Sequence, residues 1–389
     1  MGAFNPPHRL LLGAGPSNIH QRVIQAMGSP IVGHLDPYFI DVMDETKKLI
    51  AKAFKTQNKF SLPISGTGTA AMEASILNIV EEGDEVIVGV NGFFADRMEE
   101  MIQRWGGKII PIKKRWGDII TKEEIENALK NSNAKIVALV QAETSTGALQ
   151  PLQDIAKLTR SYDTILLVDA VTSFTGVELE IDRWGIDMCF SSPQKCLNCP
   201  PGASPITVNE RAMRKISNRR KPVPSLYFDF LLIDRYWSER RMYHHTAPII
   251  NVYGLREALV IALEEGLESR IAKHLNNSKA LVAGVEAAGL KMNTEKKFTL
   301  PTLNAVRIPE DVDDMRIRQI IMDTFNTEIG AGLGELKNQV LRIGLMGINS
   351  SERNVIFALD AIERAFRIEG HPIKKGAATS AAIDYFSAH

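Results

Sequence analysis

The chain has 389 residues and carries 46 Lys and Arg against 46 Asp and Glu, so its formal net charge is zero at pH 7. This balance argues against the strongly basic surface of a protein that binds nucleic acid or anionic lipid. The length predicts two domains, and three cysteines in so long a chain argue against a disulfide scaffold and for a reducing compartment.

The N-terminal sequence has neither the charged nor the apolar segment of a secretory signal, and no run reaches about 18 apolar residues, so we expect no signal peptide and no membrane span. A cytoplasmic location is expected, with the peroxisome and other organelles left open. Residues 1–20 are predicted to form an extended arm, because three prolines exclude a helix through most of it. Such an arm either crosses to a neighbouring subunit or is a disordered tail.

Helices are predicted at residues 21–27 and 36–54, and strands and helices then alternate. The short apolar runs lie at 61–64, 85–90, 108–112, 135–140, 164–168, 188–190 and 205–208, and helical periodicity occurs at 70–80, 94–105, 122–131 and 152–161. Strands that are apolar on both faces and separated by helices predict an α/β fold with a mostly parallel sheet. Ligands of such sheets bind at the carboxyl ends of the strands.

The pattern changes after about residue 250. Long helices are predicted at 255–267 and 271–288, followed by strands at 302–308, 328–330 and 340–343 and helices at 314–324 and 351–367, with a short helix at the end. This order predicts a second, smaller α+β domain. The expected division is an N-terminal arm at 1–20, a large domain at 21–266 and a small C-terminal domain at 267–389.

Two charged residues lie at the ends of predicted strands. Asp169 ends an apolar run, and Lys195 follows about 26 residues later in a constrained loop after another strand. Chemistry with pyridoxal 5′-phosphate needs such a pair, because a carboxylate keeps the pyridine nitrogen protonated and a lysine forms a Schiff base with the aldehyde. The alternatives are a helix cap for Asp169 and an exposed charge for Lys195.

A glycine-rich turn at residues 65–69 joins a predicted strand to a predicted helix. Gly66 and Gly68 allow close backbone approach, Thr67 and Thr69 offer hydroxyls, and the helix start supplies free N–H groups, which together suit a phosphate dianion. The spacing matches neither a Walker A loop nor a dinucleotide-binding fingerprint. A tight helix start without a ligand is the alternative.

Other residues have both a functional and a structural interpretation. Phe94, after a strand, could stack on a cofactor ring or pack in the core. Arg342 is a lone cation in an apolar strand, which suits a clamp for a substrate carboxylate or an internal ion pair.

Two short motifs invite a metal hypothesis. Cys196 and Cys199 form a Cys-x-x-Cys pair, but with too few neighbouring ligands for zinc, so buried thiols are favoured. His244 and His245 are adjacent, and adjacent side chains on a strand or helix point apart, so joint ligation is not expected. No metal site is predicted.

Seven segments, in this order, resemble the class V, fold-type I aminotransferases that depend on pyridoxal 5′-phosphate, and most of all the alanine–glyoxylate and serine–pyruvate group. The segments span residues 12–18, 65–69, 143–147, 168–173, 194–195, 243–248 and 341–344. The resemblance implies a large domain with a mostly parallel seven-stranded sheet, a smaller α+β domain, and a homodimer with shared active sites.

The resemblance also implies roles for individual residues. Lys195 and Asp169 would be catalytic. The implied cofactor contacts are Thr67, Gly68, Thr69, Phe94, Thr144, Asp169, Val171, Gln194 and Lys195, with Tyr243 and Thr246 from the other subunit. The implied substrate contacts are Arg342, Thr144, His34 and Asn251.

The implied reaction is a ping-pong transamination through pyridoxamine phosphate, from alanine or serine to glyoxylate or pyruvate. Lys195 would move the proton between Cα and C4′, with Asp169 holding the ring nitrogen. Ureidoglycine–glyoxylate and pyridoxamine–pyruvate aminotransferases are alternatives: Asn251 keeps the first open, and Thr67 argues against the second. A lyase of the cysteine-desulfurase kind is a third reading, which the positions of the cysteines, all at 189–199, disfavour.

Overall fold

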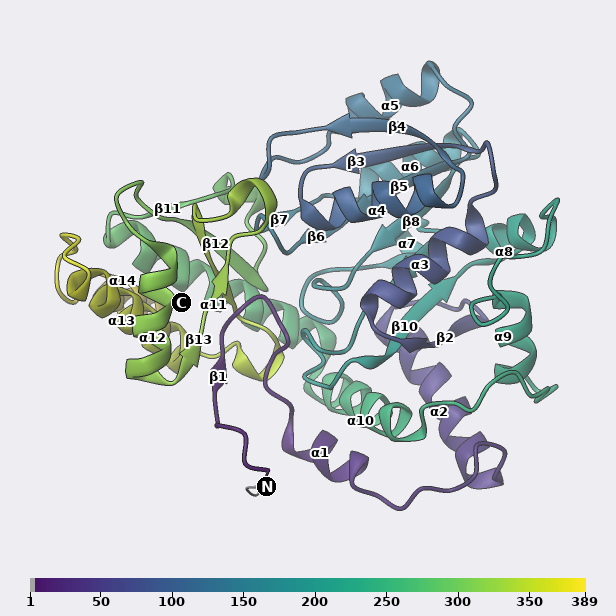
Figure 1. Ribbon diagram of the computed structural model, residues 1–389, viewed down its shortest axis with the longest axis horizontal. Coiled ribbons are helices and arrows are strands. Elements are labelled where there is room, and N and C mark those ends of the chain that lie inside the picture. The colour runs from purple at the N-terminus through teal and green to yellow at the C-terminus, as the bar shows by residue number, and fades with distance from the viewer. Residues whose placement is uncertain (1–3) are drawn as a thin grey trace.

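The computed structural model describes residues 4–389, so the first three residues of the predicted arm lie outside the described part of the chain. Figure 1 shows a larger body built around one sheet and a smaller body that contains the C-terminal helices. Seven strands form the large sheet in the order β2-β10-β9-β8-β5-β3-β4. These strands are β2 (Phe60–Gly66), β3 (Glu85–Val90), β4 (Lys108–Lys113), β5 (Ile136–Val140), β8 (Ile165–Asp169), β9 (Met188–Phe190) and β10 (Gly202–Val208).

The large sheet is mostly parallel, as predicted. Strands β4, β3, β5, β8 and β9 pair in parallel, and only β10 is antiparallel to its two neighbours. Strands β5 and β8 are buried along their whole length, which explains their continuous apolar sequence, since helices cover both faces of the sheet.

Alternate residues of the central strands belong to two different cores. Val137 and Leu166 pack with α1 (Gln21–Met27), α5 (Lys122–Lys130), α6 (Gln153–Ser161) and α10 (Ile249–Glu265), whereas Ala138 and Leu167 pack against the opposite layer. That opposite layer contains α2 (Pro37–Ala53), α3 (Gly68–Ile79), α4 (Phe93–Arg104), α8 (Glu210–Ser217) and α9 (Phe230–Trp237). The two-residue side-chain period of a strand thus builds a three-layer body.

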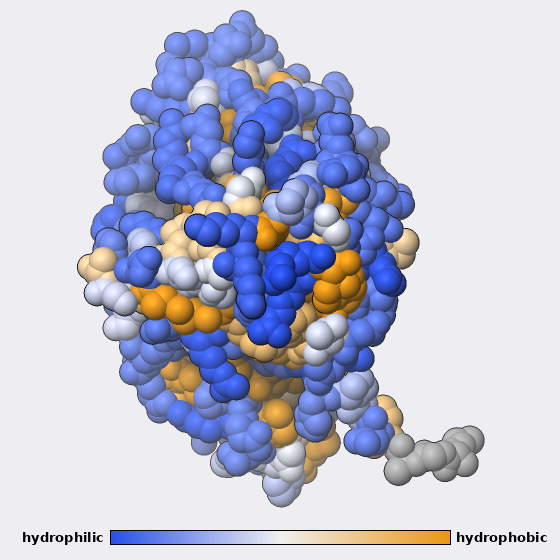
Figure 2. All heavy atoms as spheres, turned by 90° about the vertical axis from the view of Figure 1, so that its left-hand side faces the viewer, coloured by the Kyte–Doolittle hydropathy of each residue, from blue (hydrophilic) through white to orange (hydrophobic). Residues whose placement is uncertain are grey.

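The smaller body packs helices against a four-stranded antiparallel sheet of order β11-β12-β15-β14. Its elements are β11 (Lys291–Met292), β12 (Leu303–Arg307), β14 (Gly330–Ala331), β15 (Val340–Gly344), α11 (Leu267–Ala287), α12 (Asp314–Phe325), α13 (Glu352–Ile368) and α14 (Ala377–Ala388). Figure 2 views this side of the molecule, where apolar side chains gather in the middle of a mostly hydrophilic face. The architecture matches the predicted smaller α+β part, and the exact domain boundaries stay a prediction.

The described part of the arm is held by its own chain. Strand β1 (Leu10–Leu11) pairs in parallel with β13 (Thr327–Glu328), so the two segments lie side by side in Figure 1. Farther along, the Ser17 backbone N–H donates to the Gln194 carbonyl at 2.9 Å. The arm therefore connects the smaller body to the loop that carries Lys195.

Most predicted elements begin and end within a few residues of those observed, but several short elements are not predicted by the sequence. Examples are α7 (Ile181–Trp184), α8, α9, β6 (Ala142–Glu143) and β7 (Ala148–Leu149). They span two to eight residues, which is too short for periodicity to identify them. Among residues 4–389, no helix combines the length and the apolar character needed to cross a bilayer.

A buried carboxylate ties together the amino-terminal edge of the sheet. The Asp187 side chain accepts from the Leu166 backbone N–H at 2.9 Å, from Asn209 at 2.8 Å, and from the guanidinium of Arg211 at 2.7 and 2.9 Å. The Asp187 side chain is fully buried, whereas Asp163, which pairs with the same arginine, is 95% exposed.

We predict that Asp187→Ala lowers the free energy of unfolding by about 3 kcal/mol. The substitution leaves a partly buried guanidinium and a buried backbone N–H without their hydrogen-bond acceptor. The matched change Asp163→Ala removes an exposed partner of the same Arg211 and should cost less than about 1 kcal/mol. Urea unfolding followed by circular dichroism measures both values. Equal losses in the two variants would contradict the structural role given to Asp187.

Candidate active site

A cavity of about 200 Å³ lies at the carboxyl ends of β5 and β8 and at the start of α3. This is the edge of the sheet at which open α/β proteins bind ligands. Eight of the predicted site residues line it: Gly68, Thr69, Phe94, Thr144, Asp169, Val171, Gln194 and Lys195. The fold thus brings together residues from segments that are far apart in the sequence.

Asp169 is the last residue of β8, and its carboxylate is buried. Oδ1 accepts from the Val171 backbone N–H at 2.8 Å, and Oδ2 has no hydrogen-bond partner in the part of the chain that the structure describes. Burial raises the pKa of Asp169 to about 7, and nearby Glu143 adds to the rise, while Lys195 and Arg97 oppose it. An incompletely satisfied buried carboxylate is suited to accept a hydrogen bond from a protonated ring nitrogen.

Lys195 is also buried, and its Nζ donates a hydrogen bond to the Ala14 carbonyl of the arm. The Ser17 hydroxyl donates to the Lys195 carbonyl at 2.7 Å, and the buried guanidinium of Arg270 donates to the Cys196 carbonyl at 2.5 Å. Desolvation, followed by the charge of Arg342, lowers the pKa of Lys195 to about 8. The amine is therefore held in place and is more easily deprotonated than an exposed lysine.

The start of α3 forms the polar end of the cavity. Thr67 is the N-cap residue, and among the described residues its side chain makes no capping hydrogen bond. A Cβ on Gly68 would lie 2.9 Å from Cβ of Ser192, so this position has no room for a side chain. The exposed N–H groups of a helix start, with a hydroxyl on each side of Gly68, suit a phosphate.

A second buried carboxylate supports the aromatic side of the cavity. Glu143 accepts from the backbone N–H groups of Phe94 and Ala95 at 3.4 and 3.1 Å and from the Ser145 N–H at 3.1 Å. The Ser145 hydroxyl in turn accepts from the Phe93 N–H at 3.0 Å. Helix α4 thus begins on a fixed support, and this fixes the position of the Phe94 ring.

Arg342, on β15 of the smaller body, lies next to this cavity rather than among its lining residues. It is buried, and its guanidinium donates to the carbonyls of Ala331 at 2.5 Å and of Thr144 at 3.2 Å. Burial lowers its pKa to about 10. It lines an adjoining cavity of about 410 Å³ that also includes Ala14, the residue that accepts from Lys195. A guanidinium with carbonyl partners alone can still bind a carboxylate.

Besides Thr67 and Arg342, four further predicted site residues are not among those that line the cavity of their own chain. Tyr243 is 63% exposed, and its ring centre lies 5.4 Å from that of His34. Thr246 is exposed, and Asn251 donates to the Pro201 carbonyl at 3.2 Å. The placement of Tyr243 and Thr246 is compatible with a shared site, and the roles of all four residues stay predictions.

The prediction for His244 and His245 was wrong in one respect. Their Nδ1 atoms lie 2.7 Å apart, so the adjacent rings meet instead of pointing apart. The reason is that this segment is neither strand nor helix. His245 also hydrogen-bonds to the Ser65 hydroxyl at 2.6 Å, and burial lowers its pKa to about 4.

The three cysteines are buried free thiols, and burial raises the pKa of Cys196 and Cys199 to about 12.

The sequence interpretation missed four residues that line the cavity: Met72, Arg97, Val140 and Ala142. Helical spacing could have identified Arg97, which follows Phe94 by three positions and so lies on the same face of α4. Val140 is the last residue of the apolar strand β5 and Ala142 follows two positions later, and neither carries a chemical signal of its own.

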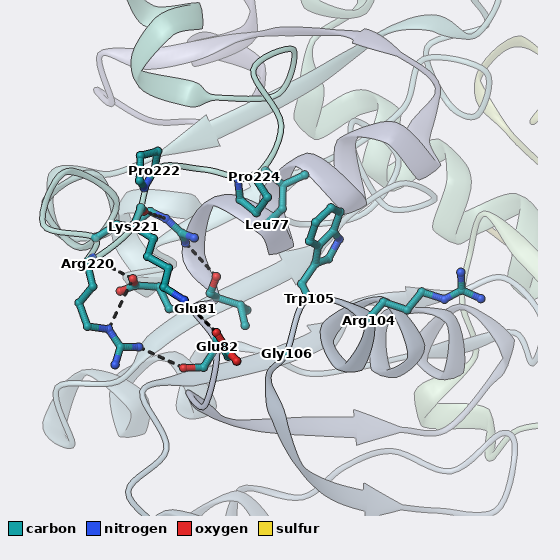
Figure 3. Close-up of a pocket in the computed structure, with 12 residues that line it drawn as sticks. Leu77, Glu81, Glu82, Arg104, Trp105, Gly106, Arg220, Lys221, Pro222 and Pro224 are labelled. Carbon is teal, nitrogen blue, oxygen red and sulfur yellow. Dashed lines mark hydrogen bonds and ion pairs between the residues drawn. The ribbon is translucent and has the colours of Figure 1, made fainter.

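A larger cavity of about 530 Å³ lies at the other end of α3, next to Leu77 and Trp105. Figure 3 shows several of its charged side chains paired with one another, including Lys221 with Glu82 at 3.1 Å, whereas Arg104 has no partner among the residues drawn. None of the predicted site residues lines it. A helix of 12 residues is about 18 Å long, so this cavity is separate from the one that contains Lys195.

Comparison with known proteins decides the family. The family model of class-V aminotransferases matches residues 9–332, which is most of the chain. The protein belongs to the class-V aminotransferases. The (S)-ureidoglycine–glyoxylate transaminase of Bacillus subtilis is 35% identical, with 98% of this chain and 96% of that protein covered.

Two solved structures extend the comparison. An alanine–glyoxylate aminotransferase from Nostoc sp. has a TM-score of 0.92 at 46% identity and covers 94% of this chain and 97% of its own. A pyridoxamine–pyruvate aminotransferase from Mesorhizobium loti has a TM-score of 0.95 at 26% identity and covers 100% of this chain and 99% of its own. The class-V family and its fold imply dependence on pyridoxal 5′-phosphate.

The residues around the cavity fit that cofactor. The close approach at Gly68 and the free start of α3 suit the phosphate. Within residues 4–389, Oδ2 of Asp169 has no hydrogen-bond partner and suits the ring nitrogen, and Lys195 offers an amine to the same cavity. The fit between the cavity and the cofactor thus follows from hydrogen-bonding groups of this chain.

We predict that apoprotein captures pyridoxal 5′-phosphate faster as the pH rises, because only the neutral amine of Lys195 attacks an aldehyde. With a pKa of about 8, the rate constant should rise about tenfold per pH unit below pH 8 and level off above it. Stopped-flow absorbance measures this profile. Arg342→Gln removes a positive charge near Lys195 and should move the midpoint of this pH profile to higher pH. A wild-type midpoint near the pKa of an ordinary lysine would contradict the assignment.

Proposed function

We propose that this aminotransferase binds pyridoxal 5′-phosphate and transfers the amino group of alanine or serine to glyoxylate or pyruvate in two half-reactions. The observation that carries the proposal is the cavity in which Lys195, Asp169 and the start of α3 meet. The relatives named for glyoxylate and alanine support the choice of substrates.

The proposed cofactor, when bound, supplies an electron sink for the carbanion that forms at Cα. Lys195 would hold the cofactor through its Nζ. Once free, the same Nζ would move the proton between Cα and C4′ as general base and acid. Asp169 would keep the ring nitrogen protonated, which a carboxylate in a desolvated cavity does more strongly than one in water.

Substrate binding is assigned to the cation of the smaller body. Arg342 would bind the α-carboxylate, since guanidinium pairs with carboxylate through two parallel hydrogen bonds. It already donates to the Thr144 carbonyl at 3.2 Å, so the carboxylate would lie close to the hydroxyl-bearing residue of the cavity. Phe94 and Val171 would lie on the two faces of the ring.

The site is proposed to be completed by a second copy of the chain. Tyr243 and Thr246 are exposed and lie outside the cavity of their own subunit, where side chains that reach a partner would be expected. A homodimer with shared active sites accounts for this placement. We also propose that the protein is located in the cytoplasm.

Ureidoglycine–glyoxylate transamination is the second candidate, because the relative from Bacillus subtilis carries that name. Asn251, near the Pro201 carbonyl, offers an amide that could recognise a ureido group from a neighbouring subunit. Pyridoxamine–pyruvate transamination is disfavoured by Thr67 and the open helix start, which suit a phosphate. A cysteine lyase would need an accessible thiol, and all three thiols are buried.

We predict that Lys195→Ala loses covalent attachment of the cofactor and lowers turnover by at least about a thousandfold, because both the attaching amine and the proton carrier are removed. The visible absorbance of the lysine-bound cofactor and the rate of the alanine half-reaction measure the two effects. Lys157→Ala, which removes a lysine that is 62% exposed, is the control. Turnover at the wild-type rate in Lys195→Ala would refute the assignment.

The donor and acceptor can be identified by initial rates for alanine, serine, ureidoglycine and pyridoxamine against glyoxylate and pyruvate. We expect the highest ratio of kcat to KM with alanine or serine and glyoxylate. A preference for ureidoglycine or pyridoxamine by more than about tenfold, equivalent to about 1.4 kcal/mol of transition-state binding, would favour the alternative. Sulfide release from cysteine would instead indicate a lyase.

A further inference from the structure

The residues assigned to the cofactor phosphate share one property, which is that none of their side chains is charged. These are the residues to which the family resemblance assigns the phosphate: Thr67, Gly68, Thr69 and Gln194, with Tyr243 and Thr246 from the other subunit. A phosphate carries close to two negative charges at neutral pH, and a helix start contributes the equivalent of only about half a positive charge. A dianion that leaves water for a partly buried cavity needs further positive charge.

Arg97 is the guanidinium that lines this cavity. It extends from α4, and one of its terminal nitrogens donates to the Thr69 hydroxyl at 3.2 Å. Within residues 4–389 it makes no ion pair with a carboxylate at 4 Å or less, so its charge is not neutralised by a direct partner. A guanidinium stays protonated at any physiological pH.

The same side chain is held against two aromatic rings. The Cζ atom of Arg97 lies 5.1 Å from the centre of the Phe93 ring and 5.2 Å from that of Phe94. Contacts of this kind are attractive because the face of an aromatic ring is electronegative. The start of α4 is fixed in turn by Glu143, so Arg97 extends from a rigid helix toward the start of α3.

We propose that Arg97 supplies the positive charge for the cofactor phosphate and positions Thr69 and Phe94, two of the groups that hold the cofactor. This inference rests on the proposed function. Its physical basis is that one side chain joins the start of α3 to the aromatic wall of the cavity. The charge of Arg97 also acts on Asp169, where it lowers the pKa of the carboxyl group and so opposes the rise that burial causes.

The test compares the binding of pyridoxal 5′-phosphate with that of pyridoxal, which lacks the phosphate. For Arg97→Gln we expect the Kd of pyridoxal 5′-phosphate to rise about tenfold or more, because a hydrogen-bonded charge is lost. The Kd of pyridoxal should change less than about threefold. Arg97→Lys keeps the charge and should recover part of the loss, and it also tests the role if Arg97→Gln does not fold.

Phosphorus NMR gives a readout that a purely structural role would not change. With the charge of Arg97 removed, the bound phosphate should take up a proton at higher pH than in the wild type, which shifts its resonance. Arg104→Gln is the matched control, because Arg104 lies on the same helix, is 73% exposed and pairs with Glu100. It should match the wild type in all three measurements.

Two results would overturn the inference. Equal losses of affinity for pyridoxal and pyridoxal 5′-phosphate would mean that Arg97 acts on the ring alone. Unchanged affinity for both would mean that Arg97 contributes to the binding of neither the phosphate nor the ring. Failure of the proposed function looks different, because wild type and Arg104→Gln would then also fail to bind pyridoxal 5′-phosphate.

Discussion

The burial of an amine and a carboxylate in one small cavity is the constraint on which the rest of this structure depends. Lys195 and Asp169 both lose water on folding, and the loss moves their pKa values toward each other, to about 8 and about 7. Buried ionisable groups are costly unless other groups hold them in place. Here hydrogen bonds to the Val171 N–H and to the Ala14 carbonyl hold the two groups.

That support comes from parts of the chain that are distant in sequence. The N-terminal arm accepts from Lys195 through Ala14 and donates to its carbonyl through Ser17. Arg270 of α11 holds the next carbonyl of the same loop. The loop is thus fixed by the arm, the larger body and the long helix that leads into the smaller body. Changes far from the cavity can therefore alter the environment of the amine.

The two bodies contribute different chemistry to the site. The larger sheet supplies the groups that suit a cofactor, since parallel strands and a helix start converge at one edge. The smaller body supplies Arg342, which lies in an adjoining cavity and donates to Thr144 across the interface. Junctions between two bodies are a common location for ligand sites. Under the proposed function, the smaller body would bind the substrate and the larger body would transform it.

The sequence by itself determined the layered α/β fold, because continuous apolar runs and helical periods are local signals. It also predicted Asp169, which ends such a run, and Lys195, which lies in the loop after another. It did not reveal Arg97, whose role depends on a contact with Thr69 from another helix, nor the meeting of His244 and His245 in an irregular loop. These were decided by tertiary structure alone, because distances between segments that are far apart in the sequence exist only once the chain has folded.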